Sequence, residues 1–71
     1  MKRFGEKLRT LRQNRGLSLR QLASELGLQA HSHIERIEAG KSKPSMSLTL
    51  KIAEFFEITP NDLVLDDIEL D

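Results

Sequence analysis

The sequence predicts an all-α domain built from five short helices, and three observations carry that prediction. The chain has 71 residues and no cysteine, which excludes a disulfide framework and leaves a compact helical core, an oligomer, or both. Its apolar residues recur at intervals of three and four, the period of an amphipathic helix. Residues that commonly begin helices alternate along the chain with glycines that commonly end them.

The first helix is expected over residues 4–14. Its apolar residues fall at i, i+4 and i+7 and form one stripe for the core: Phe4, Leu8 and Leu11. We expect the cationic side chains of the same helix to point away from this stripe: Lys7, Arg9 and Arg12. Gly16 follows as a C-cap, so the helix should end just before it.

The second helix carries both of its boundaries in the sequence. Ser18 is a good N-cap, and Gln21 stands three residues later, as a capping box requires. The apolar face is formed by Leu19, Leu22, Ala23 and Leu26. Gly27 closes the helix after about eight residues, and a helix of that length must be held by packing.

The third helix is expected to begin near Gln29 or Ala30 and to end before Gly40. Its large apolar residues are Ile34 and Ile37, three positions apart. One narrow apolar stripe leaves most of the surface of this helix facing outward. A core helix would be more apolar, so the third helix is expected to present its polar face to a partner.

The fourth helix is expected to start after Ser45, which can cap it, and to run to about Phe56. The side chains that it offers to the core are Met46, Leu50, Ile52, Ala53 and Phe56. The basic segment Lys-Ser-Lys-Pro-Ser before it reads as a loop.

The fifth helix is expected from Pro60 to Leu65. Thr59 is its N-cap, Pro60 occupies the first helical position, and Asp62 completes a capping box. The acidic residues 66–71 that follow are expected to be frayed. The whole chain is thus predicted to be a single domain, with a core over about residues 4–65 and an acidic tail.

The charges are divided between the two halves of the chain. Residues 1–43 carry ten Lys and Arg against four Glu, a net charge of +6, whereas residues 44–71 carry one Lys against seven acids, a net charge of −6. The formal net charge of zero therefore hides a basic half. Such a division is typical of a protein that binds a polyanion with one face.

Neither a membrane-spanning segment nor a secretory signal is expected. No apolar run approaches the roughly 20 residues that a transmembrane helix needs. The basic start Met-Lys-Arg-Phe-Gly-Glu-Lys-Leu-Arg-Thr lacks the apolar region of a signal peptide. The expected location is therefore the cytoplasm.

Two helices joined by a short turn containing glycine, the second with a polar face, form the layout of a helix-turn-helix. The stretches LRTLRQNRGLSLRQLASELGL and IERIEAGKSKPSMSLTLKIAEFFEITPNDLV resemble the Cro/repressor (Xre-type) helix-turn-helix domain over about residues 4–65. The resemblance rests on GLS, LA..LG, I..IE.G and P at matching spacings, followed by the ending I.P..L. It implies a five-helix, lambda-repressor-like fold that binds double-stranded DNA.

The resemblance also implies roles for individual residues. Arg12 and Glu38 match the ion pair that holds the first and third helices together in this family. The residues that match base-contacting positions, or lie beside them, are Gln29, Ala30, His31, Ser32, Glu35 and Arg36. The candidates for phosphate contacts are Arg9, Ser18, Arg20, Lys41, Ser42 and Lys43, helped by backbone amides near the starts of the second and fourth helices.

Two departures from the family pattern affect these assignments. Six residues, Leu-Gln-Ala-His-Ser-His, separate Gly27 from Ile34, where the common pattern has five. The turn is therefore expected to be one residue longer, which leaves the register of residues 29–31 open. Leu19 stands where the family usually has a phosphate-contacting glutamine, and either Arg20 or Ser18 is expected to replace it.

The two histidines are candidates for metal ligands or catalytic groups, and neither role is expected. His31 and Glu35 are spaced i, i+4, but the chain has no cysteine and no third histidine to complete a metal site. No nucleophile has a plausible base with an orienting partner, so an enzyme is not expected. No cofactor and no small-molecule ligand are expected either. His31 is expected to face the DNA groove, and His33 to pack partly inward near the second helix.

A single recognition helix reads about four base pairs, so the protein is expected to bind a palindromic operator as a homodimer. The residues assigned to the dimer interface are Phe55, Ile58, Leu63, Val64 and Leu65, and Ile68 belongs to the same apolar segment. Adjacent Phe55 and Phe56 cannot both face one core, so Phe55 is expected to point outward. The expected function is a transcriptional regulator, of the repressor or autoregulator type.

A second class of function stays open at this point. The same fold can serve as a protein–protein interaction module, as in an antitoxin or an antagonist. The acidic second half and the zero net charge fit this alternative. Weak, salt-sensitive retention of random duplex DNA would distinguish the DNA-binding class from it.

Overall fold

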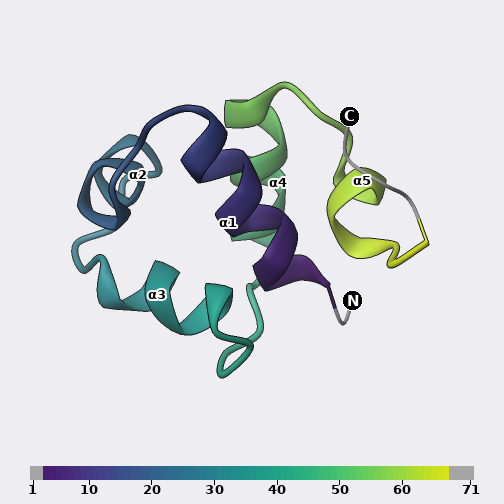
Figure 1. Cartoon of the computed structure of the whole chain (residues 1–71), viewed down its shortest axis with the longest axis horizontal. Helices are drawn as coiled ribbons and strands as arrows, with labels where there is room; N and C mark the ends of the chain where they lie inside the picture. Colours follow the sequence, from purple (N-terminus) through teal and green to yellow (C-terminus); the bar gives the residue numbers. More distant parts are fainter. Residues whose placement is uncertain (1–2, 68–71) are drawn as a thin grey trace.

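The computed structural model describes residues 3–67, and in this part of the chain the regular secondary structure is all helical, with no strand. Its helices are α1 (Phe4–Asn14), α2 (Leu19–Glu25), α3 (Ser32–Glu38), α4 (Met46–Phe56) and α5 (Pro60–Val64). Figure 1 shows α1 in the middle of the molecule, with α2 and α3 on one side and α5 on the other. The predicted all-α class with five helices is confirmed for the described residues.

α1 has the predicted bounds, and its apolar stripe faces the core. Phe4 and Leu8 are buried, and Leu11 packs against them. The expectation that Lys7 points away from this stripe was wrong, because Lys7 is only 2% exposed. Lys7 follows Phe4 by three residues and precedes Leu11 by four, so helical geometry places its aliphatic stem on the same face.

α1 crosses α3 at Gly5, which is buried. A Cβ atom at this position would overlap the carbonyl oxygens of Ile37 and Glu38. Glycine inside a helix costs about 1 kcal/mol relative to alanine. Here the missing side chain lets the two helix backbones touch, so the position of α3 depends on this residue.

α2 forms as its capping residues predict. The Ser18 hydroxyl accepts from the Gln21 amide at 3.0 Å, and the Gln21 side-chain oxygen accepts from the Ser18 amide at 2.8 Å. Leu22 and Ala23 are buried. Gly27 adopts a left-handed conformation, with φ of +73°, and turns the chain toward α3.

α3 begins later than predicted, at Ser32 rather than near Gln29 or Ala30. The extra residue between Gly27 and Ile34 lies in the turn and does not lengthen the helix. None of the residues just before the helix supplies a side-chain cap: His31 is the N-cap residue and makes no capping hydrogen bond. The start of α3 therefore has no local capping signal, and Ile34, two residues into the helix, is fully buried.

α4 starts after Ser45, whose hydroxyl accepts from the Leu48 amide at 3.0 Å. The residues that it buries are Leu48, Thr49, Ile52, Ala53 and Phe56. The expectation that Met46 and Leu50 face the core was wrong, since they are 73% and 50% exposed. Leu48, Ile52 and Phe56 recur every four residues, and Met46 and Leu50 lie two residues out of that register, so they point elsewhere.

α5 is capped as predicted and is one residue shorter at its end. The Thr59 hydroxyl accepts from the Asp62 amide at 3.3 Å, and the Asp62 carboxylate accepts from the Thr59 amide at 3.1 Å. Leu63 is fully buried in the core. A helix of five residues makes few hydrogen bonds of its own, so its place is fixed by tertiary contacts.

The contacts that fix α5 come from α1 and from the residue before it. The Lys7 ammonium donates to the carbonyl oxygen of Asp62 at 2.7 Å and to that of Leu65 at 2.6 Å. The Arg3 amide donates to the Asp66 carboxylate at 2.9 Å, and the Arg3 guanidinium donates to the Asp66 carbonyl at 2.9 Å. The expectation of a frayed tail was therefore wrong at Asp66.

The remaining tail residues, 68–71, lie outside the described part of the chain, and so does the apolar residue Ile68. Within residues 3–67, all five helices contribute to one core, which includes Leu8, Leu22, Ile34, Ile52 and Leu63, each with no exposed surface. None of the helices there combines the length and the apolar character needed to span a bilayer.

Candidate nucleic-acid interface

A buried ion pair attaches α3 to α1. The structure brings Arg12 and Glu38 together: the Arg12 Nε donates to the Glu38 carboxylate at 2.7 Å, and its Nη2 donates at 3.1 Å. The hydrogen bond to Glu38 raises the pKa of Arg12 above its ordinary value. Arg12 also donates to the Leu17 carbonyl at 2.8 Å, which ties the loop before α2 to the same pair.

Arg9, which was expected at a phosphate, also reaches this pair. Its Nε lies 3.4 Å from the Glu38 carboxylate, and about half of its side chain is exposed. Two guanidinium groups therefore share one buried carboxylate, whose side chain is 2% exposed. A carboxylate with several charge-assisted hydrogen bonds tolerates burial, and Arg9 keeps an exposed surface for a second contact.

The turn between α2 and α3 is held by backbone hydrogen bonds. The Leu28 amide donates to the Ala23 carbonyl at 2.8 Å, across the left-handed Gly27. α2 and α3 pack against each other, and Ile34 is buried beneath them. The two helices with their turn therefore form a fixed unit, from which the outer face of α3 projects.

The outer face of α3 carries the polar residues predicted to contact DNA. Ile34, Ile37 and Glu38 are buried, whereas the residues on the other side of the helix are exposed: Ser32, Glu35 and Arg36. Ser32 and Arg36 are spaced i, i+4 and therefore lie together near the middle of this exposed face. A hydroxyl, a carboxylate and a guanidinium thus form one hydrogen-bonding surface.

The other three predicted base-contacting residues lie before the helix. Gln29 and Ala30 are exposed in the turn, and His31 is half-buried at the N-cap position. The expected inward packing of His33 was wrong, because His33 is exposed. With Ile34 and Ile37 at the centre of the buried face, position 33 falls on its flank and reaches solvent.

The loop after α3 carries the predicted phosphate contacts Lys41, Ser42 and Lys43. The amides of Lys41 and Ser42 both donate to the Arg36 carbonyl, at 2.9 and 3.3 Å, so this loop is anchored on the end of α3. Both lysines are exposed, and Ser42 is half-buried.

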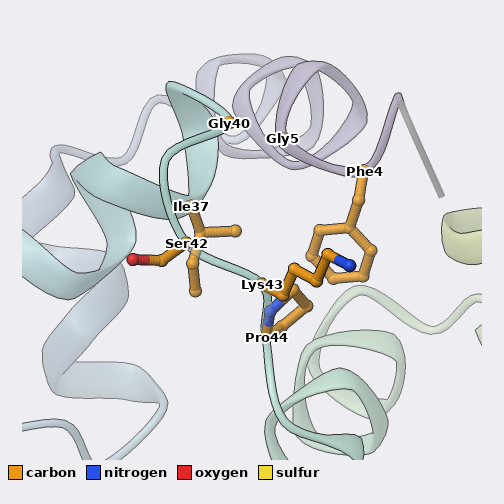
Figure 2. A pocket seen from close by; sticks show the side chains of 7 residues that line it. All are labelled: Phe4, Gly5, Ile37, Gly40, Ser42, Lys43 and Pro44. Atoms are coloured by element: carbon orange, nitrogen blue, oxygen red, sulfur yellow. The ribbon is translucent and has the colours of Figure 1, made fainter.

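An open pocket of about 470 Å³ lies where this loop meets α1. Figure 2 shows the Lys43 stem directed toward the Phe4 ring, and the Ser42 hydroxyl directed away from that ring. The pocket is also lined by Gly5, Ile37, Gly40 and Pro44. The loop is thus supported from below by apolar side chains, while its cationic groups stay at the surface.

At the start of α2, Ser18 and Arg20 are both exposed. The Ser18 hydroxyl already accepts from the Gln21 amide as the helix cap. Arg20 makes no capping hydrogen bond. Its neighbour Leu19 is half-buried against the core. Of the two residues expected to replace the missing glutamine, Ser18 is thus engaged as the helix cap.

The residues assigned to a dimer interface differ in exposure. Leu63 has no exposed surface and belongs to the core of the single subunit, so it has no surface left for a partner. Phe55, Ile58 and Val64 are half-buried, and Leu65 is 44% exposed. Phe56 is buried and Phe55 is more exposed, as their adjacent positions on one helix require.

Two further contacts lay outside the sequence-based assignments. The Arg15 guanidinium lies 5.5 Å from the Phe55 ring centre and 5.3 Å from that of Phe56, within range of a cation–π interaction. The burial of Lys7 was also missed. Its helical spacing from Phe4 was a usable signal, but nothing local identified the carbonyls that it binds.

Among residues 3–67, no three side chains of the metal-ligating types gather at one place. A family model described as a helix-turn-helix domain matches residues 5–66, which include the capped α2, the turn and the outward-facing α3. No curated protein and no solved structure matches the chain significantly. The family match agrees with the Cro/repressor resemblance, and it covers most of the chain. This chain therefore belongs to the helix-turn-helix domain family, which indicates a DNA-binding regulator.

Proposed function

We propose that the protein is a sequence-specific transcriptional regulator, of the repressor or autoregulator type, which binds a palindromic operator as a homodimer. The observation that carries this proposal is the exposed polar face of α3, with Ser32, Glu35 and Arg36 beside an anchored basic loop. A major groove about 12 Å wide admits one α-helix, and its base edges match such side chains.

In this proposal Arg36 reads a base, because a bidentate contact of Arg with guanine is the commonest specific pairing. Ser32 contacts a neighbouring base edge from the preceding helical turn, and His31 lies at the end of α3 that enters the groove. Gln29 and Ala30 reach DNA from the turn before α3, where they are exposed. Ala30 offers its methyl group to a thymine.

The cationic residues around α3 bind phosphates. Lys41, Ser42 and Lys43 form one group at the end of α3, and Arg9 and Arg20 approach from α1 and α2. Phosphate contacts fix the orientation of the protein without reading sequence. The division of charge along the chain supports this arrangement, because ten of the eleven basic residues precede Pro44 and seven of the eleven acidic residues follow it.

Selection from a random pool of DNA duplexes, followed by gel shifts with the selected sequence and with random duplex, tests the proposal. Arg36→Ala should lower affinity for the selected sequence about 5- to 100-fold and lower affinity for random duplex much less. Lys43→Ala should weaken binding to both duplexes by the same factor. It should also reduce the slope of log affinity against log salt concentration by about one per bound subunit.

Lys51→Ala is the matched control for Lys43→Ala. Lys51 is an exposed lysine of α4 that lines an open pocket together with Glu25 and Glu54, and its removal should leave both affinities unchanged. A change in the preferred sequence on replacing Lys43 would contradict its assignment to a phosphate. A wild-type protein that shows no salt-sensitive retention of random duplex would overturn DNA binding and favour the protein–protein interaction module.

A further inference from the structure

α1 contacts the recognition helix and the last helix at the same time. It packs on α3 and on α5, which lie on its two sides in Figure 1. Toward α3, Gly5 touches the backbone of Ile37 and Glu38, and Arg12 pairs with Glu38. Toward α5, Lys7 donates to two carbonyl oxygens. The position of α5 relative to α3 is therefore transmitted through α1.

Lys7 makes the polar contact between α1 and α5. Its side chain is buried, and its ammonium binds the Asp62 carbonyl at 2.7 Å and the Leu65 carbonyl at 2.6 Å. Both carbonyls belong to the end of α5, where the helix dipole is negative and free carbonyls need donors. Because α5 has five residues, its orientation depends on this contact more than on its own hydrogen bonds.

We propose that Lys7 is a positioning residue that sets the distance between the two recognition helices of the dimer, and thereby selects the spacing of the operator half-sites. This inference rests on the proposed function, a homodimer, and on the interface residues expected from the sequence, which place α5 and the end of α4 between the two subunits. Lys7 itself is buried and contacts no DNA. It acts by fixing α5, which joins the subunits, on α1, against which α3 packs.

The geometry makes the half-site spacing sensitive to small rotations of α5. The longest dimension of the molecule is 30 Å, and a dimer axis near α5 therefore lies away from α3, which gives α3 a lever arm of about half that length. Tilting the subunit by about 10° over an arm of about 15 Å moves α3 by about 3 Å. Two-fold symmetry doubles this displacement in the distance between the two α3 helices, which is then larger than the rise of about 3.4 Å per base pair. A dimer with a loosened α5 should therefore bind operators with more than one half-site spacing.

The test uses the 71-residue chain and duplexes that carry the selected half-site once, or twice at spacings varied by single base pairs. The wild type should bind its best spacing about tenfold more tightly than spacings one base pair shorter or longer. Lys7→Met keeps the apolar stem and removes the ammonium, and it should reduce this preference below about threefold. Affinity for the single half-site should change less than about twofold, because α3 is untouched.

Lys51→Met is the matched control, since Lys51 is exposed on α4, and it should keep the wild-type spacing profile. Circular dichroism reports whether Lys7→Met is folded. If it is not, Asp66→Ala decides the question, because it removes the carboxylate that accepts from the Arg3 amide and leaves the core intact. Asp66→Ala should then broaden the spacing preference in the same direction.

A folded variant with the wild-type spacing profile overturns the role of Lys7 while the proposed function stands. When Lys7→Met does not fold, an unchanged profile for Asp66→Ala does the same. A loss of single half-site affinity equal to the loss at paired sites also overturns it, because that pattern reports general damage. A wild type that binds DNA without any preference for spacing overturns the dimeric operator of the proposed function, before any variant is compared.

Discussion

At the scale of single residues, Glu38 connects the exposed face of α3 to the rest of the molecule. Its carboxylate is almost fully buried and accepts from Arg12 at 2.7 and 3.1 Å and from Arg9 at 3.4 Å. A buried charge is stable only when its partners are in place. The orientation of α3, and with it the direction in which Arg36 projects, therefore depends on this one acid.

Replacing Glu38 with Gln should lower the free energy of unfolding by about 3 kcal/mol, because Arg12 loses the charge that compensates its own. Urea unfolding at neutral pH measures this loss. The hydrogen bond to Glu38 raises the pKa of Arg12, so the stability that the pair contributes is fully present below the pKa of an unpaired arginine and is lost only above it. The loss on replacing Glu38 should therefore be the same at about pH 6 and at about pH 8. Glu35→Gln, at an exposed position of the same helix, should change stability by less than about 0.5 kcal/mol. Equal effects of the two substitutions would show that the buried pair contributes nothing.

Only some of these residue contacts could be predicted from the sequence. The pairing of Arg12 with Glu38 followed from the resemblance, because both residues stand at family positions. The burial of Lys7 was missed, because its partners are backbone carbonyls 55 and 58 residues further along the chain. Side-chain type and spacing carry no information on where a distant helix will end.

At the scale of elements, the predicted boundaries were right wherever a local signal set them. The caps Ser18, Ser45 and Thr59 all make their predicted hydrogen bonds, and the helices that they begin were placed to within a residue. α3 has no capping side chain, and its start was predicted two or three residues too early. Because no capping side chain marks that start, the positions of Gln29 and Ala30 in the turn could not be predicted from the sequence.

The end of α4 has a sequence-specific weakness that can be measured. Glu57 is the C-cap residue and adopts a left-handed conformation, with φ of +58°, which costs energy for a residue with a Cβ atom. Glu57→Gly should therefore stabilise the protein by about 0.5–1 kcal/mol in urea unfolding. Glu54→Gly, the same change at an exposed position inside α4, should instead destabilise it by about 1 kcal/mol. A loss of stability at both positions would mean that the left-handed conformation is not strained.

At the scale of the whole molecule, the elements separate the two charges and the two kinds of surface. The basic first half forms α1, α2 and α3 with the following loop, and the acidic second half forms α4 and α5. Figure 1 shows α3 and α5 on opposite sides of α1, with the loop after α3 at the bottom of the view. A dimer joined through α5 therefore directs two basic surfaces toward one DNA duplex and keeps the acidic segments away from it.

Leu65 offers the most direct test of that dimer. It is the most exposed of the residues assigned to the interface, at 44%, and it directly follows α5. Leu65→Lys should weaken self-association at least about tenfold, because it places a charge in an apolar contact. Sedimentation at micromolar concentration measures this as a shift from dimer to monomer. Met46→Lys, which adds the same charge at a still more exposed apolar residue at the far end of α4, should leave the dimer intact. If Met46→Lys dissociates the dimer and Leu65→Lys does not, the subunits associate through the start of α4, and the recognition helices are set at a spacing that α5 does not control.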